Sequence, residues 1–182
     1  AVVSGEAGGH PGLFMVGQIV QGVLAADALH KPLALAGGMG TGRHLVTALA
    51  MGAGAMLMGS RMVVAEEVWA HRRYKDRVVA IDETANRLVM KIFRNNHRVL
   101  DNDAARAVEQ LEADGATDFA HYEPLVAGAR AREAYRTGDF SQGMILAYRI
   151  AALFGEPVEA IFDEILDEAA ATMARLSKTQ VT

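Results

Sequence analysis

The chain has no cysteine, and this absence removes several kinds of chemistry at once. Disulfide bonds, metal sites built on thiolates and cysteine nucleophiles all require a sulfhydryl group, so none of them is available here. The absence fits a reducing compartment, and we expect a cytoplasmic protein. No two histidines have the spacing His-x-x-x-His. Without thiolates or such a pair, the sequence predicts no metal site.

The sequence also lacks a surplus of basic residues and any long hydrophobic run. Its 18 Lys and Arg are outnumbered by 22 Asp and Glu, the net charge is -4 at pH 7, and the basic residues are dispersed instead of forming a stripe. Nucleic acid is therefore not an expected partner. Apolar stretches such as Leu45 to Met58 are interrupted by Gly52 and Gly54 and are too short for a membrane span. We expect no membrane partner and see no targeting signal.

The residues that are present divide the chain into two parts. The first 65 residues are rich in Gly, Ala, Val, Leu and Met, whereas the remainder carries most of the charge. This shift in composition predicts a boundary near Ala65 to Lys75, and we assign residues 1–70 and 71–182 to the two parts.

Short β-like runs alternate with helical patterns in the first part, which predicts a βαβαβ organisation. The runs are apolar on both faces, as is typical of parallel strands covered by helices on both sides. The chain opens without Met on an apolar run, so we expect half of the first strand, and more chain, upstream. The predicted strands end near Ser4 and span Pro32 to Ala36 and Ala55 to Met58, and the predicted helices span Met15 to Ala28 and Arg43 to Met51.

The second part has a helical pattern from about Ala80 onward. Ile161, Ile165, Ala169 and Met173 recur at near-helical spacing, which predicts a stripe that faces a core. We therefore expect a mainly helical packing domain. The predicted helices span Ala104 to Glu112, Glu123 to Tyr135 with a break, Ser141 to Phe154, and Val158 to Leu176.

A glycine-rich loop follows the first strand and carries the imidazole of His10. Glycines at positions 5, 8, 9 and 12 permit positive φ and close backbone approach, so a flat ligand could lie against the loop with His10 facing its reactive atoms. An imidazole, with an ordinary pKa of about 6.5, suits proton transfer near neutral pH. The loop alone equally fits a connection with a solvated histidine. Glu6 orients the imidazole, pairs with a basic group, or lies in solvent.

Two more glycine loops follow the second and third predicted strands. Residues 37–43 read Gly-Gly-Met-Gly-Thr-Gly-Arg and open a helix, and Gly59-Ser60-Arg61 follows the next strand. Parallel strands end at one edge of a sheet, and backbone N–H groups at a helix start can hold a phosphate there. A tight strand-to-helix turn would use the same glycines.

Two arginines and five further histidines are candidates for a role at these loops. Arg43 and Arg61 either neutralise a phosphate or lie exposed in the first turn of a helix. The remaining histidines are expected at the surface or at helix ends, and they are His30, His44, His71, His97 and His121.

Five motifs together carry a resemblance to a known family. They are Gly5-Glu6-Ala7-Gly8-Gly9-His10-Pro11-Gly12, Ala34-Leu35-Ala36-Gly37-Gly38-Met39-Gly40-Thr41-Gly42-Arg43, Met58-Gly59-Ser60-Arg61-Met62, Arg94-Asn95-Asn96-His97-Arg98-Val99 and Gly138-Asp139-Phe140-Ser141-Gln142-Gly143-Met144. In this order and spacing they resemble the nitronate monooxygenases, formerly called 2-nitropropane dioxygenases. The resemblance spans nearly the whole chain.

The resemblance implies an α/β fold, an FMN-dependent TIM (β/α)8 barrel with an additional mainly helical domain. Residues 1–70 would be strands 6 to 8 of the barrel, and residues 71–182 the second domain and the closing helices. His10 would be the base that takes the α-proton of a nitroalkane or engages a nitronate, reduced flavin would pass electrons to O2, and nitrite and a carbonyl compound would leave. The implied FMN contacts are Gly8 and Gly9 near the ring, and Gly37, Gly38, Gly40, Gly59 and Ser60 at the phosphate.

Other activities share these loops. An NAD(P)H-dependent flavin reductase, acting on a quinone or an enoyl-acyl carrier protein, carries the same histidine and glycines, and fold analogy does not choose between them. All these activities predict a small-molecule substrate. A third hypothesis is a non-catalytic barrel fragment that acts as an interaction module, whose unpaired strand edges would favour a homodimer.

Overall fold

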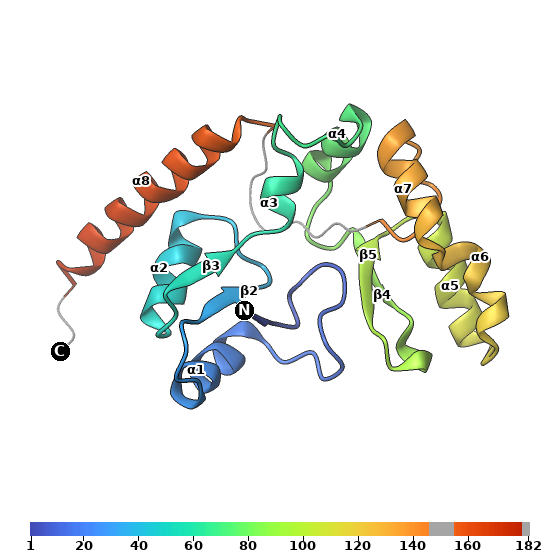
Figure 1. The fold of residues 1–182 in the computed structure, drawn as a ribbon, viewed down its shortest axis with the longest axis horizontal. Helices are drawn as coiled ribbons and strands as arrows, with labels where there is room; N and C mark the ends of the chain where they lie inside the picture. The colour runs from blue at the N-terminus through green and yellow to red at the C-terminus, as the bar shows by residue number, and fades with distance from the viewer. Residues whose placement is uncertain (146–154, 180–182) are drawn as a thin grey trace.

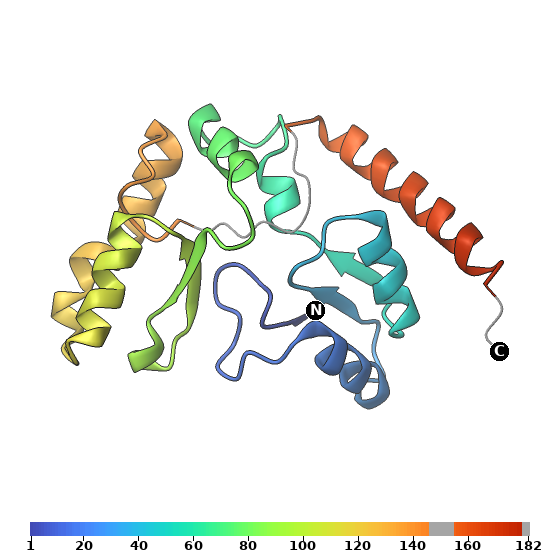
Figure 2. The same ribbon diagram turned by 180° about the vertical axis from the view of Figure 1, so that it is seen from behind.

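The computed structural model describes residues 1–145 and 155–179, in which a parallel sheet and an antiparallel hairpin are flanked by helices (Figure 1 and Figure 2). Strands β1 (Val2–Val3), β2 (Ala34–Ala36) and β3 (Ala55–Leu57) form a parallel sheet in that order. Helix α1 (Gln18–Ala28) joins β1 to β2, and α2 (Gly42–Ala50) joins β2 to β3. The predicted βαβαβ organisation is confirmed.

The sheet packs against α2 through small and medium apolar side chains. Leu35 of β2 is fully buried, in one cluster with Leu33, Met39, Ala48 and Ala53. Burying a leucine side chain of this kind stabilises the fold by about 1.5–3 kcal/mol. The apolar pattern of the second predicted strand thus corresponds to residues that lie in the core.

Helix α1 begins three residues later than predicted because of a side chain outside it. The carboxylate of Glu6 accepts hydrogen bonds from the backbone N–H of Gln18 at 3.1 and 3.0 Å, and Met15 has a positive φ of 49°. Gly17, at the N-cap position, has no side chain to satisfy the first amides of the helix. Glu6 therefore caps α1, a role that none of the predicted alternatives for Glu6 included.

The second part contains a β-hairpin, so the prediction of a helical pattern from about Ala80 onward is wrong for this segment. Strands β4 (Asn86–Val89) and β5 (His97–Leu100) pair antiparallel, with Val89 opposite His97. Val89 and Val99 are fully buried in a cluster with Val108 and Tyr122. Tertiary burial of these valines stabilises a hairpin whose four-residue strands carry little local signal.

Helices surround the hairpin on one side (Figure 1). Asn102 caps α5 by accepting the backbone N–H of Ala105 at 2.8 Å, and α7 ends where Gly138 adopts a φ of +76°. Residues 141–145 are not helical, contrary to the prediction for 141–154, and residues 146–154 lie outside the described residues. The elements are α3 (Ser60–Val63), α4 (Arg72–Ala80), the 3-10 turns Lys91–Phe93 and Phe119–His121, α5 (Asp103–Ala113), α6 (Glu123–Val126), α7 (Gly128–Thr137) and α8 (Val158–Leu176).

Helix α8 packs against α2 instead of the hairpin helices (Figure 2). A Cβ on Gly42 would lie 2.4 Å from the backbone N of Ala169, so the two helix backbones meet where only glycine fits. Three residues of the predicted stripe, at positions 161, 165 and 169, are buried, but Met173 is 55% exposed and Thr172 is buried in its place. The prediction that Met173 faces the core is wrong, because the line of buried side chains turns gradually around the helix axis.

Helix α1 exposes an apolar face to solvent. Ile19, Val20 and Leu24 of α1 are between 57% and 77% exposed.

None of the helices in the described ranges has the length and hydropathy of a membrane span.

Candidate active site

The three glycine loops meet at one edge of the sheet, as predicted. In the parallel register Val3 lies opposite Ala36, and Ala36 opposite Leu57. The three strands therefore end side by side, and the loops that follow them begin at the same edge of the sheet. Gly37 has a φ of +109°, and a Cβ there would lie 2.3 Å from the hydroxyl of buried Ser4. Only glycine permits this approach between the first two loops.

Two backbone amides at this edge are available to a ligand. Among residues 1–145 and 155–179, no protein group accepts a hydrogen bond from the N–H of Gly38 or Gly59. A Cβ on Gly59 would meet nothing within 4 Å, and Gly38 has a φ of +67°. Free amides beside open space are what an anionic group requires. The loops after β2 and β3 therefore fit a phosphate.

Another backbone amide of the predicted phosphate site already donates a hydrogen bond inside the protein. Gly40 is buried, and its N–H donates to Nδ1 of His44 at 3.2 Å. Burial, with a smaller effect of the Arg43 charge, lowers the pKa of His44, which favours the neutral ring that accepts this bond. A cofactor phosphate would compete with His44 for the Gly40 amide.

The N-terminus of α2 also has an internal anion. The backbone N–H of Gly42 donates to Glu168 of α8 at 2.7 Å, and Nε of Arg43 lies 2.7 Å from the same carboxylate. Burial tends to raise the pKa of Glu168, but these bonds outweigh it and lower the pKa. The start of α2 thus holds α8, and Arg43, 68% exposed, points to Glu168.

Arg61 does not lie exposed, so that alternative is wrong for it. Its side chain is buried and pairs with Glu164 of α8 and, at 3.6 Å, with Glu156. Both carboxylates belong to the segment that packs near α3, so Arg61 ties the third glycine loop to the C-terminal helix.

The His10 loop is held by β5 across the junction between the two parts. Gly9 and Arg98 exchange backbone hydrogen bonds at 2.9 and 2.6 Å. The guanidinium of Arg98 donates to the carbonyls of Gly5 at 3.0 Å and Ala7 at 3.2 Å. Asn96 donates its side-chain N–H to two further carbonyls, those of Gly12 at 3.0 Å and Leu13 at 3.1 Å. We call Asn96 and Arg98 the loop clamp.

His97 lies between the two clamp residues and stacks on His10. The ring centroids are 4.2 Å apart and the planes are inclined by 15°. Burial, with a smaller effect of His10, lowers the pKa of His97 to about 4, so its ring is neutral at pH 7. The expectation of a surface position is wrong for His97. Its place in the Arg94 to Val99 motif was the only sequence signal for this role.

The stack orients an exposed imidazole. His10 is exposed to solvent, whereas Nε2 of His97 is buried and, within the described chain, has no hydrogen-bond partner. A ring held by stacking on one face presents its nitrogens in a restricted plane. The arrangement can hold a proton acceptor in a fixed orientation on the loop that follows β1.

The pH dependence of stability tests the burial of His97. Unfolded histidine titrates near 6.5 and His97 at about 4, so the unfolded chain binds more protons between these values and stability falls as the pH falls. His97→Phe keeps a stacked ring without the titration. Between pH 7 and 5 the wild type should lose about 1 kcal/mol more than this variant in urea unfolding, a value discounted for partial exposure. Equal losses in both proteins would contradict the assignment.

Comparison with known proteins defines the class. The family model for nitronate monooxygenase matches residues 1–160. The chain therefore belongs to the nitronate monooxygenase family.

Two curated relatives match the chain over part of their length. One is (3aS,4S,5R,7aS)-5-hydroxy-7a-methyl-1-oxo-octahydro-1H-indene-4-carboxyl-CoA dehydrogenase of Rhodococcus jostii, 33% identical over 108 residues, which are 59% of this chain and 30% of that protein. The other, from Bacillus subtilis, is described as "Probable nitronate monooxygenase" and is 32% identical over 114 residues, 59% of this chain and 33% of that protein. The chain aligns with about a third of each relative.

Solved structures share the fold. FabK from Thermotoga maritima superposes with a TM-score of 0.86 at 28% identity and covers 96% of this chain and 55% of that one. Nitroalkane oxidase from Streptomyces ansochromogenes gives a TM-score of 0.74 at 21% identity, over 96% of this chain and 52% of that one. The mixed α/β arrangement is therefore shared with these solved structures, and the chain covers about half the length of each.

Proposed function

We propose that the chain carries the base and part of the cofactor site of an FMN-dependent oxidoreductase that oxidises nitroalkanes and alkyl nitronates. The observation that carries this proposal is the position of His10, stacked on His97 and exposed in the first of three loops that leave the same edge of the sheet. Membership in the nitronate monooxygenase family supports it.

Within this proposal the glycine loops and His10 have separate roles. The amides of Gly38 and Gly59 donate to the FMN phosphate, and Gly8 and Gly9 let the flavin ring approach the His10 loop. The nearby residues Gly37 and Ser60 shape the same phosphate site. Bound FMN supplies the acceptor for two electrons, which O2 then receives. The imidazole of His10 removes the α-proton of the nitroalkane and releases it to solvent.

We further propose that β1, β2 and β3 correspond to strands 6 to 8 of a TIM barrel. Three parallel strands with helical crossovers support this, as does the similarity to about half of FabK. The exposed apolar side chains of α1 are then a surface that the rest of a barrel covers.

The activity is tested by anaerobic spectroscopy of the FMN-bound protein. A nitronate should bleach the flavin absorbance within seconds, and admission of O2 should restore it with formation of nitrite. NADH or NADPH should bleach it much more slowly. Bleaching by a nicotinamide nucleotide alone would refute the nitronate oxidation.

An NAD(P)H-dependent flavin reductase is the second candidate. Similarity to FabK at 28% identity favours it. The same spectra separate the two. A purified protein that is colourless and does not take up FMN would instead favour the non-catalytic interaction module.

A further inference from the structure

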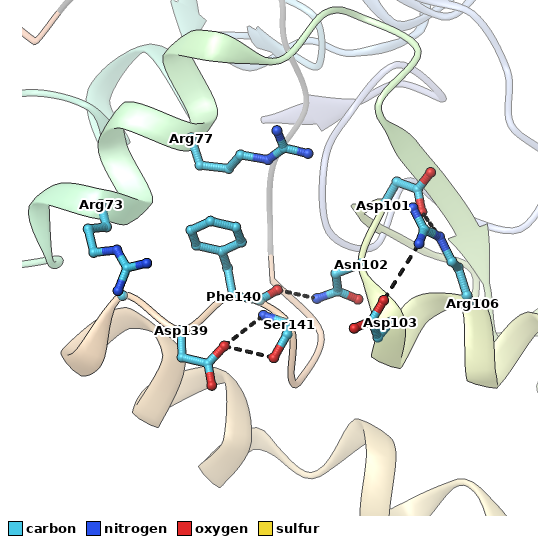
Figure 3. A pocket seen from close by; sticks show the side chains of 10 residues that line it. Arg73, Arg77, Asp101, Asn102, Asp103, Arg106, Asp139, Phe140 and Ser141 are labelled. Atoms are coloured by element: carbon cyan, nitrogen blue, oxygen red, sulfur yellow. Dashed lines mark hydrogen bonds and ion pairs between the residues drawn. The ribbon is translucent and has the colours of Figure 1, made fainter.

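A second cleft lies away from the glycine loops, between α4, the turn after α7 and the start of α5 (Figure 3). Its volume is about 480 Å³, which is within the usual range for small-molecule sites. No residue of the proposed flavin site lines it.

Side-chain hydrogen bonds to the backbone and close packing of a glycine turn hold the walls of this cleft in place. Asn102 donates its side-chain N–H to the carbonyls of Phe140 at 2.9 Å and Gly143 at 3.0 Å. A Cβ on Gly138 would lie 2.5 Å from Nδ1 of His71, so glycine alone allows the turn to approach α4 so closely. The cleft is therefore a defined feature of the fold.

Two arginines one helical turn apart reach into the cleft from α4. Figure 3 shows Arg73 and Arg77 on the wall that faces the turn after α7. Among the described residues neither guanidinium has a carboxylate within 4.0 Å, and Nε of Arg77 is buried without a hydrogen-bond partner. The guanidinium of Arg77 lies 5.9 Å from the centre of the Phe140 ring, which orients it.

Within the described ranges the carboxylates that line the cleft form no ion pair with Arg73 or Arg77. Asp101 lies 2.8 Å from both Arg87 and Arg106, and Asp103 lies 3.6 Å from Arg106, so both are compensated on the opposite wall. Asp139 accepts the hydroxyl of Ser141 at 2.7 Å, and this hydrogen bonding, with a smaller effect of the Arg73 charge, lowers the pKa of Asp139. The α4 wall therefore offers two guanidinium groups whose natural partner is an anion.

The cleft and the His10 loop are connected by one strand. His97, at the start of β5, stacks on His10, and Asp101, directly after β5, lines the cleft. At about 3.3 Å per residue, four residues of strand place the two about 13 Å apart. An extended small molecule can span this distance.

We propose that Arg73 and Arg77 bind the phosphate group of an organic phosphate ester, carried by a nucleotide or by phosphopantetheine. A guanidinium group can recognise phosphate oxygens through two parallel hydrogen bonds, and two such groups lie on one wall of the cleft. This site lies beyond the proposed oxidation and does not rest on it, because binding needs neither flavin nor turnover.

The test is calorimetric titration of the full chain with ADP and, separately, with 4′-phosphopantetheine. At least one should bind, and the double variant Arg73→Gln/Arg77→Gln should raise its Kd at least about tenfold. The matched control Arg72→Gln/Arg136→Gln removes the same charge from two exposed residues that pair with Asp76 and Glu133, and it should raise Kd less than about threefold.

Each outcome decides the proposal. Tighter binding of ADP identifies a nucleotide, and tighter binding of phosphopantetheine identifies a thioester carrier. Absence of binding of both esters, or an equal loss in the control variant, would overturn the site. If the double variant fails to fold, exposed Arg73 can be changed alone, and a Kd unchanged by Arg73→Gln overturns the proposal as well.

Discussion

Replacing His10 by alanine should lower kcat with a neutral nitroalkane about a hundredfold to ten-thousandfold, the usual contribution of a general base. His10 is exposed in the loop that follows β1, whereas the free amides of Gly38 and Gly59 belong to the loops after β2 and β3. FMN content should therefore stay near that of the wild type. Steady-state kinetics and the flavin absorbance of the purified variant measure the two effects.

A preformed nitronate provides the internal control for this variant. It has already lost its α-proton, so His10→Ala should reduce its oxidation much less than that of the nitroalkane. His121→Ala, which changes an exposed histidine of the second part, should leave both rates unchanged. Unchanged turnover of the nitroalkane by His10→Ala would show that His10 is not the base.

The second large effect is expected at Arg98 of the loop clamp. Arg98→Ala removes donors to the carbonyls of Gly5 and Ala7 and to the side chain of Asn86, the last at 2.7 Å. Hydrogen bonds from a charged donor contribute about 1.5–3 kcal/mol each, with incomplete additivity, so the variant should lose about 2–4 kcal/mol of unfolding free energy. Because the His10 loop loses its anchor, kcat should fall at least about tenfold.

Chemical denaturation and kinetics at constant FMN saturation measure these losses. Arg132→Ala, an exposed arginine of α7, is the control and should change stability by less than about 0.5 kcal/mol. Arg98→Lys should recover less than half of the loss, since one ammonium group cannot reproduce the planar fork of donors. An Arg98→Ala variant with wild-type stability and kcat would exclude a clamp.

Local pattern was sufficient for the elements around the glycine loops. The apolar run before Gly37 predicts β2, and Thr41, which accepts the backbone N–H of His44 at 3.3 Å, marks the start of α2. Such signals lie within a few residues of the structure that they specify. The positions of the three loops at one edge then follow from parallel pairing.

The hairpin β4–β5 and the contacts of α8 could not be predicted in this way. The strands depend on burial of Val89 and Val99 against helices, and Glu168 meets the amide of Gly42 across 126 residues of sequence. Side-chain periodicity carries no information about such partners, because they are decided by packing between elements.

The sequence by itself determined that glycine loops follow successive strands, that one of them carries His10, and that the chain resembles the nitronate monooxygenases. The conformational freedom of glycine and the succession of strand, loop and helix along the chain are local properties, so the residues alone specify them. Only the tertiary structure decided that His97 stacks on His10, that Arg98 anchors the loop, and that Glu168 occupies the start of α2. These contacts join segments far apart in the chain, and folding against a shared core is what brings their side chains into reach.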